Sequence, residues 1–277
     1  MSLFITSLNS GSNGNCYYIG NADEAVLVDA GISCRETEKR LKRLDLDIKK
    51  IKAIFISHEH GDHISGVETL ANKHLIPVYI TPATLRNSRL RINEPLIKSF
   101  TAYNPVQIGA LSVRAFPKLH DAIDAHSFVV SGSGLNVGVF TDIGAPCTHV
   151  IDNFKQCHIA FLEANYDEDM LQNGRYPHHL KKRISGDHGH LSNRQALELF
   201  IQHKPDFMSM LYLSHLSKDN NSPHLALELF APHAGDTDVV VASRYQETPV
   251  YFEPGTTGPS KEHIFAKPVQ MSLFSVG

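Results

Sequence analysis

The segment 56-ISHEHGDHISG-66 concentrates ionisable side chains at the end of an apolar run, 51-IKAIFI-56. The run lacks polar alternation, which predicts a β-strand that is covered on both faces. His58 and His60 are two residues apart, so an extended backbone directs both toward the same side. Asp62 and His63 follow in the next turn, where they can face a second metal ion. Because imidazole and carboxylate groups are good ligands for divalent cations, the pattern H-x-H-x-D-H predicts a metal site where this strand ends.

The overall composition is ordinary for a globular protein. The 277 residues include 42% hydrophobic and 20% charged residues, and the length suits one large domain or two small ones. A net charge of −3 provides no global basic field, so any nucleic acid must be held by a local patch. The N-terminus does not resemble a signal peptide and no apolar run reaches the roughly 18 residues of a membrane span, so we expect a cytoplasmic protein. The four cysteines lack C-x-x-C spacing and are expected to be free buried thiols rather than disulfides or zinc ligands.

Apolar runs separated by turn residues predict strands with helices outside them. Strands are expected at 4–8, 16–20, 25–31 and 51–56, and again at 111–116, 126–131, 135–140, 158–163, 207–214 and 238–242. Ser33 and Ser192 each open a capping-box pattern, and Pro223 occupies a favoured first helical position. These signals predict a layered α/β arrangement.

Three isolated polar residues follow later strands of this prediction. His120 lies just beyond the strand at 111–116, Asp142 just beyond the strand at 135–140, and His215 just beyond the strand at 207–214. Each alone is better interpreted as a loop or core residue. Because all three lie at the carboxyl ends of predicted strands, we favour a role that they share with the histidine cluster.

These motifs resemble those of the metallo-β-lactamase-fold hydrolases. The resemblance covers most of residues 1–246 and implies an α/β fold, the four-layer αββα metallo-β-lactamase sandwich, with two divalent metal ions along its edge. It implies that His58, His60 and His120 hold one metal, that Asp62, His63 and His215 hold the other, and that Asp142 bridges them. Asp29 in 25-AVLVDAG-31 matches the first acidic motif of the family, which supports the histidine loop from outside the ligand shell. A turn residue at a strand end is the alternative interpretation of Asp29.

The residue at the bridging position bears on the chemistry. The β-lactam-cleaving enzymes with this motif commonly have a cysteine in the second site, whereas 140-FTDIG-144 offers Asp142. A carboxylate bridge suits two hard cations about 3.5–4 Å apart, which can activate a water molecule and neutralise charge on a phosphodiester. We therefore favour a phosphodiesterase over a β-lactamase, and we count Asp62 among its catalytic residues. Ligand sets of this type accept zinc, manganese or iron.

The segment 187-DHGHLSN-193 resembles the D-x-G-H-S element of tRNA-processing relatives with the same fold. By that resemblance His190 is the general acid and Asp187 orients it or its loop. A polar loop capped by Ser192 is the alternative. A longer signature, made of 119-LHDAIDAHSF-128, residues 163–193 and 214-SHLSKDNNSPHLA-226, resembles the bacterial YycJ/WalJ-like family and implies DNA exonuclease activity. That family has Ser-Asn-His where this chain has Ala164-Asn165-Tyr166, which puts any role of this segment in doubt.

Basic and aromatic residues near His190 suit nucleic-acid binding. Tyr166 and Tyr176 are placed to stack on bases. A solvated helix face explains the basic residues equally well. The candidate phosphate contacts, which carry no sequence specificity, are Arg175, Lys181, Lys182, Arg183 and Arg194.

Residues 247–277 are rich in Pro, Gly and Thr and are expected to form a C-terminal arm or tail after a catalytic domain of residues 1–246. Within 268-PVQMSLFSVG-277, four residues resemble the short peptide by which bacterial DNA enzymes dock in the pocket of the sliding clamp. These residues are Gln270, Met271, Leu273 and Phe274. Packing of the same residues as a last strand on the domain is the alternative.

Together these features predict a binuclear-metal phosphodiesterase that acts on nucleic acid, as a DNA exonuclease in repair or replication. An alternative is a phosphodiesterase of the same fold for RNA or a small cyclic nucleotide. Another is a clamp-binding or regulatory protein without catalysis. The complete ligand set argues against this last alternative, because a decayed site should have lost a ligand.

Overall fold

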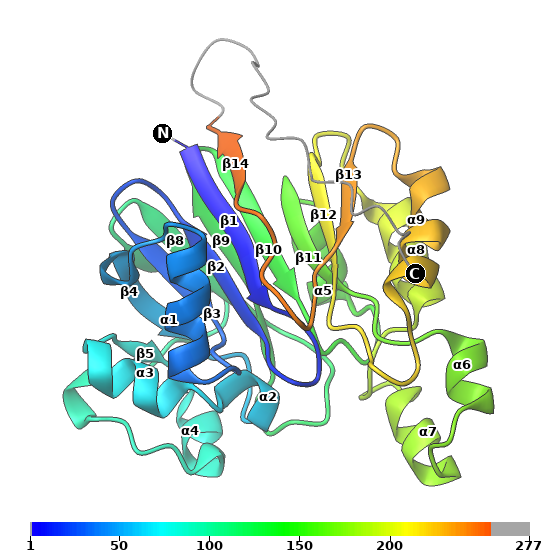
Figure 1. Cartoon of the computed structure of the whole chain (residues 1–277), viewed down its shortest axis with the longest axis horizontal. Helices are drawn as coiled ribbons and strands as arrows, with labels where there is room; N and C mark the ends of the chain where they lie inside the picture. The colour runs from blue at the N-terminus through cyan, green and yellow to red at the C-terminus, as the bar shows by residue number, and fades with distance from the viewer. Residues whose placement is uncertain (1, 256–277) are drawn as a thin grey trace, which may run out of the picture.

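Two seven-stranded β-sheets, packed face to face, form the centre of the structure, a computed structural model that describes residues 2–255 (Figure 1). The first sheet has the order β14-β1-β2-β3-β4-β5-β6 and the second the order β13-β12-β11-β10-β9-β8-β7. The strands of the first sheet are β1 (Ser2–Asn9), β2 (Cys16–Gly20), β3 (Ala25–Val28), β4 (Ile51–Phe55), β5 (Val78–Tyr79), β6 (Ile97–Lys98) and β14 (Tyr251–Pro254). Those of the second are β7 (Val106–Ile108), β8 (Leu111–Pro117), β9 (His126–Gly132), β10 (Leu135–Phe140), β11 (Ile159–Glu163), β12 (Met210–Ser214) and β13 (Asp238–Val241).

Helices cover the outer face of each sheet, which completes the predicted four-layer αββα sandwich (Figure 1). On the side of the first sheet lie α1 (Cys34–Arg43), α2 (Gly61–Ile64), α3 (Val67–His74) and α4 (Pro82–Ser88), with the 3₁₀ turns η1 (Ile48–Lys50) and η2 (Glu94–Leu96). On the side of the second lie α5 (Thr148–Phe154), α8 (Asn193–His203), α9 (Pro223–Phe230) and η3 (Ala231–His233). The short helices α6 (Glu168–Asn173) and α7 (His178–Ile184) project beyond the end of this layer.

Aromatic side chains fill the space between the two sheets. Phe55 from the first sheet and Phe128 from the second meet edge to face, with ring centroids 5.7 Å apart. Tyr17 and Phe161 make a second contact across the interface at 4.7 Å. All four side chains are buried, and burial of one such apolar side chain stabilises the fold by about 1.5–3 kcal/mol. This core fixes how the ends of the two sheets face each other.

The expected strands and helix starts are confirmed. Ser33 caps α1 by accepting a hydrogen bond from the Glu36 backbone N–H at 3.2 Å. Ser192 and Gln195 form a complete capping box at the start of α8, and Ser222 caps α9 with Pro223 in its first turn. The four cysteines, all within the described range, are unpaired, as expected.

One region differs from the expectation. Residues 61–98 carried no predicted element, yet they form three helices and two strands of two residues each. Val67, Leu70 and Ala71 have helical spacing and bury one face of α3. Within the segment expected to form a C-terminal arm or tail, Tyr251–Pro254 pairs with β1 as an antiparallel strand. The clamp-peptide residues Gln270, Met271, Leu273 and Phe274 lie outside the described residues. None of the helices between residues 2 and 255 has the length and apolar character needed to cross a bilayer.

Candidate metal centre and active site

Three site residues follow strands in a left-handed backbone conformation. Asp29 follows β3 with φ of 59°, Asp142 follows β10 with φ of 54°, and His215 follows β12 with φ of 56°. Such values are uncommon for residues other than glycine, and they concentrate at functional sites where the surrounding structure holds them. The backbone N–H of His215 donates to Ser10 Oγ at 2.8 Å, which ties the end of the second sheet to the first. The strand ends therefore deliver these side chains to one edge of the sandwich.

The first donor set consists of three histidines. His58 follows β4, His60 precedes the first residue of α2, and His120 follows β8. Nδ1 of His60 lies 3.1 Å from Nε2 of His58 and 3.3 Å from Nε2 of His120. His58 and His120 are buried, and His60 is half-buried. The structure thus brings together the three residues expected to hold one metal.

The second donor set combines carboxylates and imidazoles. Nε2 of His215 lies 3.3 Å from Oδ2 of Asp62, and Nε2 of His63 lies 3.0 Å from Oδ2 of Asp142. Asp142 also faces the first set, because its Oδ1 lies 3.8 Å from Nε2 of His120. The ligand atoms of this set, Asp62, His63, Asp142 and His215, all lie within 4.8 Å of one another. Asp142 therefore stands between the two sets.

Hydrogen bonds to Nδ1 orient four of the histidines. His63 Nδ1 donates to Asp29 Oδ2 at 2.7 Å, and His120 Nδ1 donates to the Gly189 carbonyl at 3.1 Å. His215 Nδ1 lies 2.9 Å from Glu163 Oε1, which can only accept a hydrogen bond, so this nitrogen carries the proton. His58 Nδ1 pairs with Ser57 Oγ at 2.9 Å. With Nδ1 engaged, Nε2 is the nitrogen of each ring that faces the centre, and it can bind a metal once it is free of a proton.

Two features indicate that cations fit this centre. Nδ1 of His60 lies within 3.3 Å of Nε2 of both His58 and His120, and three ring nitrogens that converge in this way cannot all satisfy one another by hydrogen bonds. Oδ2 of Asp142 is buried, and although His63 Nε2 lies at 3.0 Å it makes no hydrogen bond of acceptable geometry. An unsatisfied buried carboxylate oxygen is costly unless a cation satisfies it. The His and Asp clusters are therefore compatible with divalent metal binding.

The two donor sets differ in their electrostatics. Burial lowers the pKa of His120 to about 4 and holds the pKa of His58 well below its usual value. Burial also opposes the charged form of His215, but Asp142, Asp62 and Glu163 outweigh it and raise the pKa of His215 to about 10. Burial acts against the charge of Asp142 as well, yet His215 and His63 hold its pKa well below the usual range. The second set is thus an anionic environment that attracts positive charge.

A buried carboxylate that the sequence analysis did not single out organises the centre. Glu163 ends β11 and is fully buried. Its Oε1 accepts hydrogen bonds from Nδ1 of His190 at 2.8 Å and of His215 at 2.9 Å. Its Oε2 accepts from the backbone N–H of Ile143 at 2.6 Å and of Leu191 at 3.2 Å. Despite burial, His190 and His215 lower the pKa of Glu163 to about 2. Position at the carboxyl end of a predicted strand, the signal used for His120, Asp142 and His215, also applies to Glu163.

The neighbours of His190 differ from those expected. Asp187 is exposed, and among the described residues no hydrogen bond joins its side chain to His190, whose Nδ1 is held by Glu163. The Asp187 backbone instead packs against Gly144, where a side chain would collide with it. The doubtful segment 164–166 does support the site, because Asn165 Nδ2 donates to the His215 carbonyl at 2.8 Å. Tyr166 is only 4% exposed, so it is not available to stack on a base.

A cleft of about 390 Å³ opens onto the candidate metal centre. Its lining includes Asp62, Asp142 and His215 of the second donor set, together with Ser12 and Ser217. The helix α7 and the residues before it contribute Tyr176, Leu180 and Arg183 to the lining. Arg183 Nε pairs with Asp121 Oδ2 at 2.5 Å, and Tyr176 Oη donates to Asp219 at 2.9 Å.

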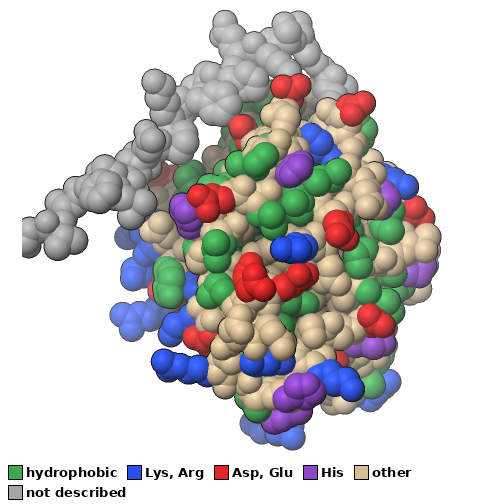
Figure 2. All heavy atoms as spheres, turned by 90° about the vertical axis from the view of Figure 1, so that its right-hand side faces the viewer, with side chains coloured by type: hydrophobic (Ala, Val, Ile, Leu, Met, Phe, Trp, Pro, Cys, Tyr) green, Lys and Arg blue, Asp and Glu red, His purple; other side chains and the backbone are tan. Residues whose placement is uncertain are grey.

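The other basic candidates lie outside the cleft lining, with Arg175, Lys181 and Lys182 on the same projection and Arg194 in the first turn of α8. Arg175 and Lys182 are exposed, and Lys181 Nζ donates to the Gln172 carbonyl at 2.6 Å. Arg194 lies 3.6 Å from a Glu168 carboxylate oxygen. Figure 2 shows Lys, Arg and His side chains gathered at the lower end of this face of the molecule, the level at which α7 lies in Figure 1. The projection therefore offers positive charge beside the mouth of the cleft.

Two facing sheets with helices outside them, and His and Asp donor sets along one edge, define a hydrolase of the metallo-β-lactamase fold. A family model described as a beta-lactamase superfamily domain matches residues 24–215. The chain belongs to this superfamily and, within it, to the YycJ/WalJ family. It is 34% identical over 229 residues to the exodeoxyribonuclease YycJ of Bacillus anthracis, which covers 82% of this chain and 87% of that protein.

Two further comparisons agree with this assignment. The chain is 31% identical over 224 residues to the exodeoxyribonuclease WalJ of Streptococcus pneumoniae, which covers 79% of this chain and 83% of that protein. The metallo-β-lactamase fold protein YhfI from Bacillus subtilis superimposes with a TM-score of 0.69 at 17% identity, covering 91% of this chain and 99% of that one. The structural likeness confirms the predicted fold, and the sequence likeness confirms the predicted family.

Proposed function

We propose that this chain is a binuclear-metal-dependent phosphodiesterase that degrades DNA as an exonuclease in repair or replication. The position of Asp142 carries the proposal, because its two carboxylate oxygens face different donor sets, at 3.8 Å from His120 and 3.0 Å from His63. The naming of the YycJ and WalJ relatives as exodeoxyribonucleases supports DNA as the substrate. Four unpaired cysteines support action in the cytoplasm, where thiols stay reduced.

Two divalent cations would be held at this edge, one by His58, His60 and His120 and the other by Asp62, His63 and His215, with Asp142 shared. Nitrogen and oxygen ligands of this kind suit zinc, manganese or iron. When bound, the cations supply Lewis-acid activation of water and neutralise charge that develops on the phosphodiester. Asp62 is half-buried and lines the cleft, where its carboxylate can orient a nucleophilic water as well as bind a cation.

His190 is positioned to protonate the leaving oxygen. Its side chain lines the cleft and is 21% exposed, while Nδ1 is held by the buried Glu163 carboxylate. This hydrogen bond leaves Nε2 as the nitrogen that faces the substrate. A positioned general acid contributes typically about 10²–10⁴-fold to the rate. We assign Glu163 the orienting role that the sequence had suggested for Asp187.

The basic projection is suited to holding the phosphates of the strand outside the cleft. Arg183 lines the cleft directly, and Arg175, Lys181 and Lys182 lie on the same projection. Phosphate contacts of this kind are independent of sequence and weaken with added salt. Tyr176, which lines the same wall, remains the candidate for stacking on a base.

The direct test is digestion of end-labelled nucleic acids by the full chain loaded with Mn²⁺ or Zn²⁺. We expect stepwise shortening of DNA from an end, with RNA and a cyclic nucleotide cut more slowly. Asp142→Ala should abolish turnover while Asp206→Ala, which alters an exposed aspartate, should not. If fully loaded protein leaves every nucleic acid intact, the nuclease assignment is wrong.

The role of His190 can be tested through the leaving group. His190→Ala should slow DNA cleavage by about 10²–10⁴-fold. It should slow bis-p-nitrophenyl phosphate much less, because p-nitrophenolate leaves without needing a proton. An equal loss on both substrates would contradict the general-acid assignment.

A further inference from the structure

A second group of metal-ligating side chains lies outside the candidate active site. Cys34 and Glu38 are four residues apart in α1 and so lie on the same face of that helix. His74 lies in the last turn of α3, which packs beside α1. One ligand atom from each residue lies within 4.8 Å of the others. We propose that Cys34, Glu38 and His74 form a separate binding site for a zinc ion, which joins α1 to α3.

The geometry brings three different zinc donors to one point. Sγ of Cys34 lies 3.5 Å from Oε1 of Glu38, and Nε2 of His74 lies 2.7 Å from the same oxygen. Thiolate sulfur, carboxylate oxygen and imidazole nitrogen are the three ligand types that zinc uses in proteins. Each close contact is now a hydrogen bond from the thiol or the imidazole to the carboxylate. A cation between the three atoms would take the place of these protons.

The three side chains differ in how deeply they are buried, and the difference suits a zinc site that is open on one side. Cys34 is 5% exposed, while the side chains of Glu38 and His74 are 30% and 23% exposed. The sulfur is therefore shielded, and the outer side is open for a cation to enter. Three protein ligands with a water molecule in the fourth position is a common arrangement for zinc. The thiolate also selects zinc over magnesium, calcium and manganese.

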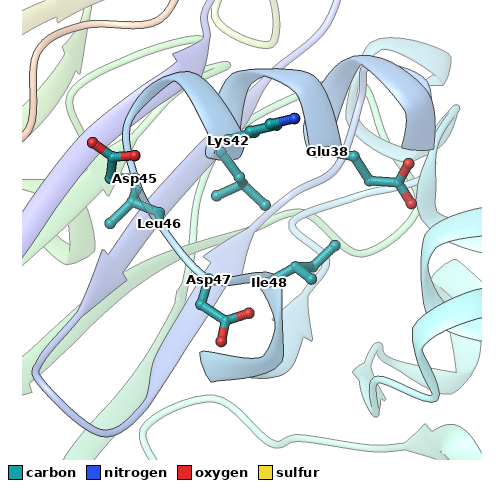
Figure 3. Close-up of a pocket in the computed structure, with 7 residues that line it drawn as sticks. Glu38, Lys42, Asp45, Leu46, Asp47 and Ile48 are labelled. Carbon is teal, nitrogen blue, oxygen red and sulfur yellow. The ribbon is translucent and has the colours of Figure 1, made fainter.

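The neighbouring pocket does not supply the ligands. An open hollow of about 340 Å³ lies between α1 and η1 and is lined by Glu38, Lys42, Asp45 and Asp47, among others. Figure 3 shows Glu38 at one end of this hollow, with its carboxylate directed away from Asp45 and Asp47. The donors that accompany Glu38 are therefore those on the side of α3, and the site is set by the packing of the two helices.

A helix-to-helix ion pair explains part of the cluster but not the cysteine. Lys73 Nζ lies 2.6 Å from Glu38 Oε1, and this pair with His74 would link the helices without any metal. Lys73 is 55% exposed, so it can swing into solvent when a cation arrives. The hydrogen bonds from Lys73 and His74 lower the pKa of Glu38 to about 2, so the carboxylate is already charged at neutral pH. Burial raises the pKa of Cys34 to about 11, so zinc must displace a proton from the thiol.

Cobalt(II) absorption distinguishes this site from the active site. Ligation by a thiolate produces a sulfur-to-cobalt charge-transfer band in the near ultraviolet, and the active-site donor sets contain no sulfur. Titration of the full chain with cobalt(II) should produce this band, and zinc should bleach it. Cys34→Ser should remove the band and one equivalent of bound metal. Cys147→Ser, which alters a half-buried cysteine outside the cluster, should leave both unchanged.

A second pair of variants tests the site from α3. His74→Gln should weaken the band at a given cobalt concentration, and Lys73→Gln should strengthen it by removing the competing ammonium group. His74→Gln also tests the proposal if Cys34→Ser does not fold, which circular dichroism would reveal. Absence of the band at saturating cobalt, or its survival in Cys34→Ser, would overturn the proposal. Because absorption is measured rather than hydrolysis, neither outcome depends on the proposed nuclease activity.

Discussion

Replacement of Glu163 by glutamine removes one charge from the centre without changing the shape of the side chain. The carboxylate accepts four hydrogen bonds, two from His190 and His215 and two from backbone N–H groups. An amide has one oxygen, so its NH₂ group must face one of these pairs of donors. Two N–H donors thereby lose their acceptor. At about 1–3 kcal/mol for each unsatisfied buried donor, the free energy of unfolding should fall by about 2–6 kcal/mol.

The same substitution can weaken metal binding rather than lower the free energy of unfolding. If the amide NH₂ faces the two histidines, each ring can shift its proton from Nδ1 to Nε2 and accept from the amide. His215 would then present a protonated Nε2 to the metal, which prevents ligation. We therefore expect Glu163→Gln to lower metal affinity and to reduce DNA hydrolysis by about 10²-fold or more, because His190 also loses its orientation.

Three measurements test this reasoning on the same protein. Guanidinium unfolding with a chelator gives the stability, competition with a chromophoric chelator gives the metal affinity, and end-labelled DNA gives the activity. Glu198→Gln, which alters an exposed glutamate of α8, is the matched control and should change none of them. If Glu163→Gln retains wild-type stability, affinity and activity, the four hydrogen bonds do not act as described.

Further predictions concern residues around the centre and in the core. Asp29→Asn weakens the acceptor that His63 and Ser57 share, so metal affinity should fall about 10–100-fold in a chelator competition; an unchanged affinity would exclude this supporting role. Phe161→Ala opens a cavity between the sheets and should lower the free energy of unfolding by about 3–5 kcal/mol, measured by chemical denaturation, and a loss below 1 kcal/mol would contradict the packing described. Burial lowers the pKa of His126, so below pH 6.5 the unfolded chain binds a proton that the folded chain does not, and stability should fall as the pH drops from 6.5 toward the folded-state pKa. His126→Asn should flatten this part of the pH dependence of unfolding. An unchanged slope would show that other groups cause the loss of stability.

Most of the candidate metal ligands could be predicted from the sequence, because they lie close together in the chain or directly after predicted strands. His58, His60, Asp62 and His63 lie within six residues, so the backbone alone places them together. His120, Asp142 and His215 were found because each follows a predicted strand. Glu163 satisfies the same rule, but a glutamate that ends a strand is common, and nothing nearby in the sequence marks it as a partner of His190. Its role depends on β11 lying between β10 and β12.

Local patterns in the sequence predicted most of the strands, the capped helix starts and the candidate metal ligands, because hydrophobic periodicity, capping boxes and H-x-H-x-D-H act over a few residues. Tertiary structure decided which side chains meet across long separations. Asp187 lies near His190 in sequence but points to solvent, whereas Glu163 is 27 residues away and holds it. Cys34 and Glu38 share a helix face by their spacing alone, yet only the packing of α1 against α3 brings His74 to them. Such contacts are set by how sheets and helices pack, which no short stretch of sequence encodes.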